Sequence, residues 1–96
     1  MKRQQAIELL TRSKPELQER YGITALALIG STARDVATAY SDVDILVNFD
    51  GPATSQRYFG VQFYLEDIFG CPIDLVTEKA LRPELRPFIE KELVDV

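Results

Sequence analysis

Three segments of the chain have the apolar pattern of β-strands. Residues Ile23–Ile29 are apolar at nearly every position, which is typical of a strand buried on both faces. Residues 42–49 alternate instead, so one face of this expected strand carries Val43, Ile45, Val47 and Phe49. A third short strand is expected at Ile73–Thr77. The chain therefore predicts a sheet of at least three short strands.

Helical spacing of apolar residues dominates the rest of the chain. A capping box at Ser13 with Pro15 in the first turn predicts that a second helix begins there, separate from the first. Thr54 or Ser55 can cap the longest later helix, whose apolar stripe is Tyr58, Val61, Leu65 and Ile68, and Gly70 ends it. The expected helical segments are 2–10, 13–20, 31–36, 55–69, 78–81 and 84–92, the last two interrupted by Pro83 and Pro87.

The order of these elements predicts an α/β (α+β) fold with a small mixed sheet and helices. The helix between the strands at 42–49 and Ile73–Thr77 favours parallel, right-handed pairing of the two. Asp42, Asp44 and Asp74 then lie at the starts of neighbouring strands. If the first strand runs antiparallel to the middle one, its end at Gly30 reaches the same rim. The sequence thus predicts that these four residues meet at one edge of the sheet.

Composition narrows the chemistry available to that edge. The chain has 96 residues, which predicts one domain over 1–96, and it contains no histidine. Histidine-based nucleophilic catalysis and zinc sites are therefore excluded, and acid–base or metal chemistry must depend on carboxylates. The net charge of −4, without a Lys/Arg-rich run, argues against broad binding to nucleic acid.

The same totals favour a cytoplasmic location. The apolar runs are far shorter than the ~20 residues needed to cross a membrane, so no membrane association is expected. The basic first residues are not followed by an apolar stretch with a small-residue cleavage site, so no secretory leader is expected. The lone cysteine, Cys71, suits a reducing compartment, since it has no partner within the chain for a disulfide.

The carboxylates at the expected rim are candidate metal ligands. Asp42 and Asp44 are two positions apart on a strand, so both side chains point to one face. Like charges ~4 Å apart repel by about 4 kcal/mol at an effective dielectric constant near 20, so such a group needs cations. Carboxylate oxygens suit Mg²⁺ or Mn²⁺, and two such ions can stabilise the attacking and leaving oxygens of a phosphoryl displacement. Gly30 and Ser31 allow close approach of a phosphate to the backbone and offer a hydroxyl.

Three sequence motifs together resemble a known family. Residues 30–34 (GSTAR), 41–47 (SDVDILV) and 73–76 (IDLV) are similar to the motifs of MNT-type minimal nucleotidyltransferases, which belong to the DNA polymerase beta-like superfamily. The resemblance implies that Asp42, Asp44 and Asp74 are catalytic and bind metal. It also implies that Gly30 and Ser31 hold the triphosphate of a nucleotide. Arg34 and Ser41, which lie in the same motifs, are further candidates for nucleotide binding.

The resemblance further implies a reaction and a partner. Members of this family pair with HEPN-domain RNase toxins, and as antitoxins they can transfer AMP from ATP to a tyrosine of the toxin. The expected activity is therefore metal-dependent transfer of a nucleotide to a protein hydroxyl. The sequence itself identifies neither the nucleotide nor the acceptor.

Three residue assignments remain open at this point. Asp35 stands where the family usually has glycine, which favours the alternative of a weak or inactive module that neutralises a toxin by binding alone. Arg34 either contacts phosphate or forms a structural ion pair with a nearby acid. Phe59 and Phe63 lie off the main helical stripe, so they belong either to the core or to an exposed partner surface.

Overall fold

A four-stranded mixed sheet organises the protein, whose computed structural model describes residues 1–36 and 42–96. The strand order is β3-β2-β1-β4. The antiparallel pairing of β1 with β2 and the parallel pairing of β2 with β3 are both as predicted. The strands are β1 (Ile23–Ile29), β2 (Val43–Phe49), β3 (Ile73–Thr77) and β4 (Val94–Asp95).

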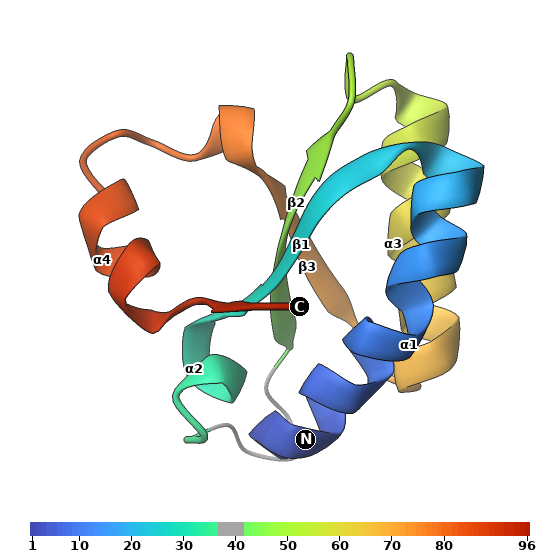
Figure 1. The fold of residues 1–96 in the computed structure, drawn as a ribbon. Coiled ribbons are helices and arrows are strands. Elements are labelled where there is room, and N and C mark those ends of the chain that lie inside the picture. The colour runs from blue at the N-terminus through green and yellow to red at the C-terminus, as the bar shows by residue number, and fades with distance from the viewer. Residues whose placement is uncertain (37–41) are drawn as a thin grey trace.

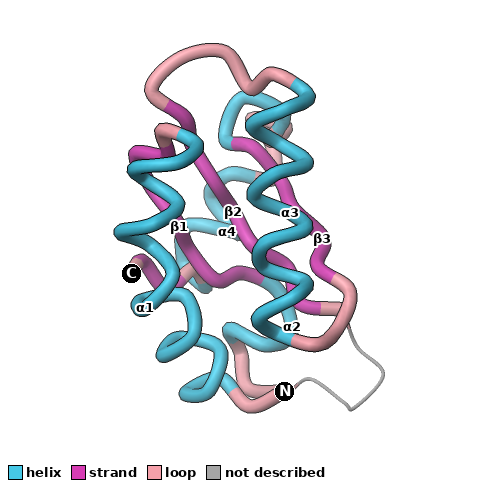
Figure 2. The backbone as a smooth tube through the Cα atoms, turned by 90° about the vertical axis from the view of Figure 1, so that its right-hand side faces the viewer, coloured by secondary structure: helices cyan, strands magenta, loops and turns pink. Residues whose placement is uncertain are grey.

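Helices cover the two faces of this sheet unequally. The long helices α1 (Arg3–Tyr21) and α3 (Ser55–Phe69) lie side by side on one face, as Figures 1 and 2 show. The 3₁₀ turn η1 (Glu78–Ala80) and the short helix α4 (Arg86–Glu92) lie on the opposite side, in the C-terminal segment. The single turn α2 (Gly30–Ala33) follows β1 directly at the lower rim in Figure 1. No helix in the described ranges is long and apolar enough to span a membrane.

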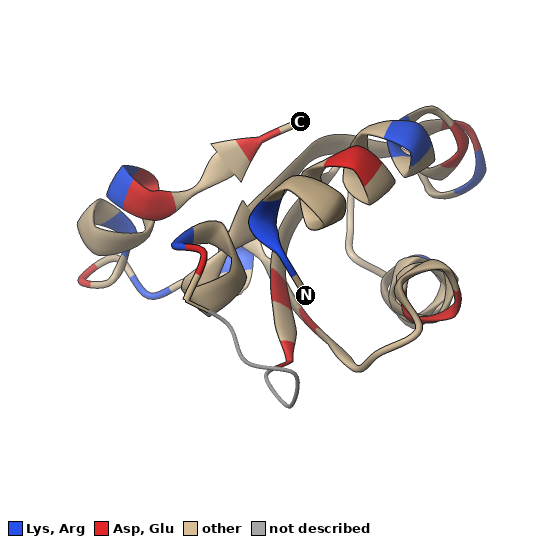
Figure 3. Cartoon of the chain, turned by 90° about the horizontal axis from the view of Figure 1, so that it is seen from below, with Lys and Arg blue, Asp and Glu red and all other residues tan. Residues whose placement is uncertain are grey.

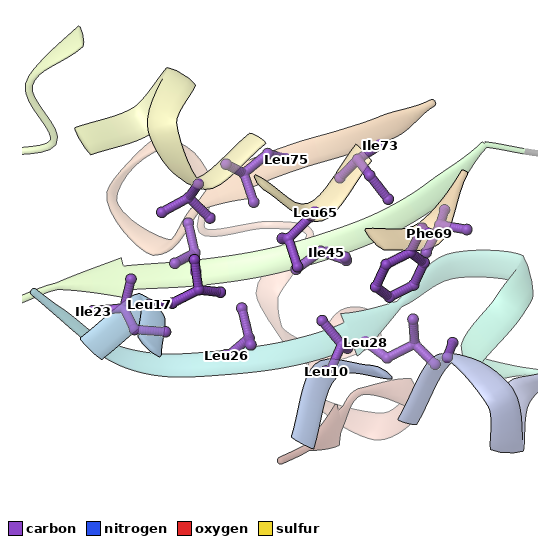
Figure 4. Close-up of a cluster of buried hydrophobic side chains, with 14 of the residues drawn as sticks. Leu10, Leu17, Ile23, Leu26, Leu28, Ile45, Leu65, Phe69, Ile73 and Leu75 are labelled. Carbon is purple, nitrogen blue, oxygen red and sulfur yellow. The ribbon is translucent and has the colours of Figure 1, made fainter. Parts of the chain in front are cut away.

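The alternation of β2 separates two apolar clusters. Val43, Ile45 and Val47 are at most 1% exposed and face α1 and α3, where they join the main core shown in Figure 4. The intervening Leu46 faces the other side, where it forms a smaller cluster with Ala27 and Ile29 under α4. The sheet is therefore buried on both faces in its middle, as predicted for β1, and polar side chains reach the second face only near the strand ends.

The predicted break between helices at Ser13 is wrong, because α1 continues through Pro15. Buried residues recur at helical spacing on both sides of the proline: Ala6, Leu10, Ser13 and Leu17. Packing of this one face outweighs the ~3 kcal/mol that an interior proline costs. The Ser13 hydroxyl does not cap a new helix but donates a 2.7 Å hydrogen bond to the Leu9 carbonyl.

The C-terminal segment also differs from the prediction. Pro87 does not interrupt a helix, because α4 begins at Arg86 and places the proline in its first turn, where no N–H is needed. The expected helix at 78–81 is only the 3₁₀ turn η1, and the one at 31–36 is only α2. The strand β4 was not predicted. It pairs with Ala27 and Leu28 of β1, and the Lys14 ammonium donates to the Val96 carbonyl beyond it.

Candidate functional site

The strand pairing brings acidic residues from two strands to one rim of the sheet. The parallel register of β2 and β3 places Asp44 beside Asp74, and the antiparallel register of β1 places Ile29 beside Asp44. Asp42 directly precedes β2 and is exposed. Seen from below in Figure 3, acidic positions occupy the near ends of the central strands, with α2 beside them. The predicted convergence of these aspartates with the end of β1 is therefore present in the fold.

Gly30 lies in contact with the Asp44 carboxylate. Its φ of 74° lies in the left-handed region that favours glycine. A Cβ atom built at this position would overlap Oδ2 of Asp44. The backbone can thus approach the carboxylate only because position 30 has no side chain. This close approach, called the cradle below, places the Asp44 carboxylate beside the start of α2.

The electrostatic environment of Asp44 disfavours its negative charge. Burial is the largest cause, and a side-chain hydrogen bond with Asp74 and the charges of Asp74 and Asp42 act in the same direction. Together they raise the pKa of Asp44 from 3.8 to about 6, against a smaller lowering by Arg34. A cation placed between the carboxylates would stabilise the ionised form of Asp44.

The donor set fits a hard divalent cation, and Asp44, Asp74 and Asp42 are the described residues that could hold it. Asp44 and Asp74 offer paired carboxylate oxygens, and neither histidine nor thiolate competes with them. Among residues 1–36 and 42–96, no three acidic or cysteine side chains are already arranged around one point. The charge of Asp42 affects Asp44, and a three-carboxylate set would require the Asp42 side chain to turn toward this pair.

The other predicted nucleotide-binding residues are distributed around α2. Ser31 is half-buried in this turn, next to Gly30. Arg34 follows α2, and its guanidinium donates a 3.1 Å hydrogen bond to Glu92 of α4. This is the ion pair that the sequence left open as an alternative to a phosphate contact. Ser41 lies outside the described residues.

Asp35 has a structural role that the sequence did not predict. Its φ of 59° is the one positive value outside glycine in the described ranges, so the residue occupies the conformation for which the family usually has glycine. Its Oδ1 accepts a 3.2 Å hydrogen bond from the Arg3 backbone N–H in the first turn of α1. Lys2, at the cap position of α1, makes no side-chain cap. That missing cap in the sequence was the available signal for a distant acceptor.

The aromatic pair on α3 is exposed and lies on the other side of the sheet from this rim. Phe59 is 48% and Phe63 63% exposed, and their rings stack with centroids 6.0 Å apart. The alternative of an exposed surface is therefore confirmed over a place in the core. The neighbouring Tyr58 points inward instead, and its hydroxyl donates to the Leu75 carbonyl.

Comparisons with known proteins agree with this geometry. The family described as nucleotidyltransferase domain matches residues 10–96. A Methanocaldococcus jannaschii protein named as a candidate protein adenylyltransferase is 39% identical over 93 residues, covering 93% of this chain and 92% of the relative. The protein adenylyltransferase MntA of Thermococcus cleftensis is 35% identical over 88 residues, covering 92% and 89%.

Solved structures show the same arrangement of elements. One described as a candidate minimal nucleotidyltransferase superposes with a TM-score of 0.80 at 30% identity, over 100% of this chain and 97% of the other. A toxin–antitoxin structure with AMP-PNP superposes with a TM-score of 0.69 at 18% identity, over 99% of this chain and 72% of the other, which shows a shared fold.

Proposed function

The chain belongs to the nucleotidyltransferase domain family and is a minimal nucleotidyltransferase, and on that premise we propose that it transfers AMP from ATP to a hydroxyl group of a partner protein. The observation that carries the proposal is the pairing of Asp44 with Asp74 against the side-chain-free Gly30. This rim offers a carboxylate pair and close backbone access at one place, which a nucleotide triphosphate with divalent cations requires.

The proposed step is an in-line displacement at the α-phosphorus. The acceptor oxygen forms a bond to that phosphorus, the bond to the bridging oxygen breaks, and pyrophosphate leaves. Two Mg²⁺ or Mn²⁺ ions, when bound, would neutralise the carboxylates and stabilise the entering and leaving oxygens. Asp42, Asp44 and Asp74 would hold the ions, and one of these carboxylates would accept the hydroxyl proton, since the chain has no histidine.

The nucleotide would be held by the turn that follows β1. Gly30 lets a phosphate approach the backbone, and the N–H groups of the first helical turn have no partners within the helix itself. Ser31 would add a hydroxyl donor. Ser41 would contribute from the neighbouring loop, and Arg34 would contact phosphate after leaving Glu92. Holding the phosphates in this way orients the α-phosphorus toward the acceptor, which is the main task in phosphoryl and nucleotidyl transfer.

We propose that the acceptor is a tyrosine of a HEPN-domain RNase toxin and that the chain is its antitoxin. The support is that relatives at 35–39% identity are named as protein adenylyltransferases, and that a protein of the same fold is described in a toxin–antitoxin assembly. The acidic chain, with a net charge of −4, also suits a basic protein partner better than nucleic acid. We also propose that the pair acts in the cytoplasm, since the proposed substrate is ATP.

A direct assay can test this function. The protein is incubated with ATP, Mg²⁺ and a co-encoded HEPN-domain protein, and the intact mass of the partner is measured. The proposal predicts the addition of AMP at a tyrosine, with none in the Asp74→Asn variant. Modification of RNA or DNA ends, with none on the partner, would contradict the proposed acceptor. An unmodified partner whose toxicity is still neutralised would favour the binding-only alternative, for which Asp35 is the specific observation.

A further inference from the structure

A cavity of about 140 Å³ lies on the same face of the sheet as the paired carboxylates. Along β2, side chains at alternate positions share a face, so Asp44, Leu46 and Asn48 all point toward the side covered by α4. Leu46 and Asn48 line the cavity, and η1 and α4 close it from the other side. The cavity therefore lies farther along β2 than the carboxylate rim, on the same face of the sheet.

The size and floor of the cavity suit one flat ring system. Its floor includes Ala27 and Leu46, which are 3% and 7% exposed. Ile89 of α4 and Leu93, which directly follows this helix, form an apolar wall. A cavity of roughly 150 Å³ can take up a benzene ring, whereas pockets for drug-sized ligands are about 300–1,000 Å³. A planar heterocycle fits this space, and a whole nucleotide does not.

Polar groups around the cavity are mainly acceptors. The carboxylates of Glu78, Glu90 and Asp95 line it, together with the single cationic side chain of Arg86. The Asn48 side chain adds an amide, which can accept and donate on the edge of an aminated purine. This lining is complementary to a base that carries an exocyclic amino group, because that group is a hydrogen-bond donor.

The position of the cavity matches the geometry of a nucleotide. Leu46 is two residues from Asp44 and Asn48 is four, which places the cavity ~7–13 Å from the carboxylates along an extended strand. A base lies at about this separation from the reacting phosphate of its own nucleotide. A nucleotide held at the rim could thus place its base in the cavity without a change in the sheet.

Resting on the proposed function, we propose that this cavity binds the nucleobase of the nucleotide triphosphate and selects bases with an exocyclic amino group, adenine in the case of ATP. The side-chain amide of Asn48 forms hydrogen bonds with the polar edge of the base. Leu46 and Ile89 enclose its apolar faces. The α4 segment is then part of the substrate site and gives the chain a specificity that the carboxylates and Gly30, which contact only phosphates, do not provide.

Calorimetric titration with Mg²⁺ present can distinguish the contribution of the base to binding affinity from that of the phosphates. ATP, inosine triphosphate and inorganic tripolyphosphate are each titrated into the wild type, Asn48→Leu and Gln56→Leu. Gln56→Leu is the control, since it also replaces a side-chain amide by leucine. Gln56 is exposed and lies on α3, away from the cavity. Circular dichroism and melting temperature establish that each variant is folded.

The inference predicts that Asn48→Leu weakens ATP binding by about tenfold and leaves tripolyphosphate binding unchanged, as one or two lost hydrogen bonds imply. The wild type should bind ATP more tightly than inosine triphosphate, and Asn48→Leu should lose this preference. Equal ATP affinity in the wild type and Asn48→Leu would overturn the base site while leaving the proposed function intact. Failure of the wild type to bind either ATP or tripolyphosphate would overturn the proposed function itself.

Discussion

The surroundings of Asp44 disfavour its negative charge, and this has a measurable effect on the stability of the fold. Its pKa is raised from 3.8 to about 6, mainly by burial and then by Asp74. Between these values the folded state binds a proton that the unfolded state does not, so stability falls as the pH rises through 6. Above pH 6, in the absence of cations, the ionised carboxylate destabilises the fold.

Asp44→Asn should therefore raise the melting temperature at pH 7.5 in EDTA. The gain should be a few degrees, because the carboxyl keeps contact with water and ~1 kcal/mol corresponds to about 4–8 °C in a domain of this size. The difference from the wild type should shrink as the pH is lowered to 5. Asp67→Asn, an exposed change of equal charge on α3, is the control. A similar gain in both variants would mean that net charge, and not the pairing with Asp74, is responsible.

Substitutions at Gly30 and Gly70 distinguish the effect of backbone strain from the effect of contact with the site. Both have φ near 70°, but a Cβ at Gly70 would meet nothing within 4 Å, whereas one at Gly30 would overlap the Asp44 carboxylate. Gly70→Ala should cost ~1 kcal/mol and leave ATP affinity unchanged. Gly30→Ala should cost more and abolish measurable ATP binding. Unchanged ATP binding by a folded Gly30→Ala variant would show that the cradle is not part of the nucleotide site.

At the scale of elements, Asp35 links the turn after α2 to the start of α1. Asp35→Asn keeps an oxygen acceptor for the Arg3 N–H and a residue tolerated at positive φ, and it removes the charge. Asp35→Gly relieves the backbone but loses the hydrogen bond, so its stability should be near that of the wild type.

Both Asp35 variants should bind ATP more tightly, because a negative charge near the triphosphate is removed. Titration calorimetry gives the affinities and thermal melting gives the stabilities. Tighter binding by Asp35→Gly alone would attribute the effect to backbone strain. Weaker binding by both variants would contradict the expectation and assign Asp35 a positive role in holding the nucleotide.

The ion pair between α2 and α4 tests the role of Arg34. A double-mutant cycle with Arg34→Gln and Glu92→Gln should give a coupling energy of about 0.2–1 kcal/mol without nucleotide, as expected for a half-exposed pair. If Arg34 turns to the phosphates, the coupling should approach zero with ATP and Mg²⁺ bound. A coupling energy that ATP does not change, with normal ATP affinity in Arg34→Gln, would leave Arg34 a purely structural residue.

The same elements show what the sequence could and could not predict. The three long strands and α3 were predicted because alternation, glycine ends and the Thr54 cap are local signals. The continuity of α1 through Pro15 was missed, since it depends on burial of Leu10 and Leu17 against the sheet. The two-residue strand β4 has no periodicity of its own and exists through pairing with β1. Long-range packing decided both cases.

In the molecule as a whole, the sheet brings together residues that are distant in the sequence. Gly30, Asp44 and Asp74 span more than 40 positions, and their meeting was predictable from strand directions alone. The cavity beneath α4 was not, because it depends on how far the C-terminal segment stands from the sheet. The exposure of Phe59 and Phe63 likewise required the packing of α3 to be known. The sequence thus predicted the topology of the sheet better than it predicted the exposed surface and the shape of the cavity.

If the carboxylate rim directs attack on the α-phosphorus of ATP, only the α-phosphate of the nucleotide reaches the acceptor, and labelled phosphates can show this. The protein is incubated with Mg²⁺, the proposed HEPN-domain partner, and ATP labelled at either the α- or the γ-phosphate. We expect label on the partner from α-labelled ATP only. This label should be lost with EDTA and in Asp44→Asn or Asp74→Asn, and retained in Asp67→Asn. Transfer of the γ-label, or α-label transfer that persists in the Asp44 and Asp74 variants, would contradict this expectation.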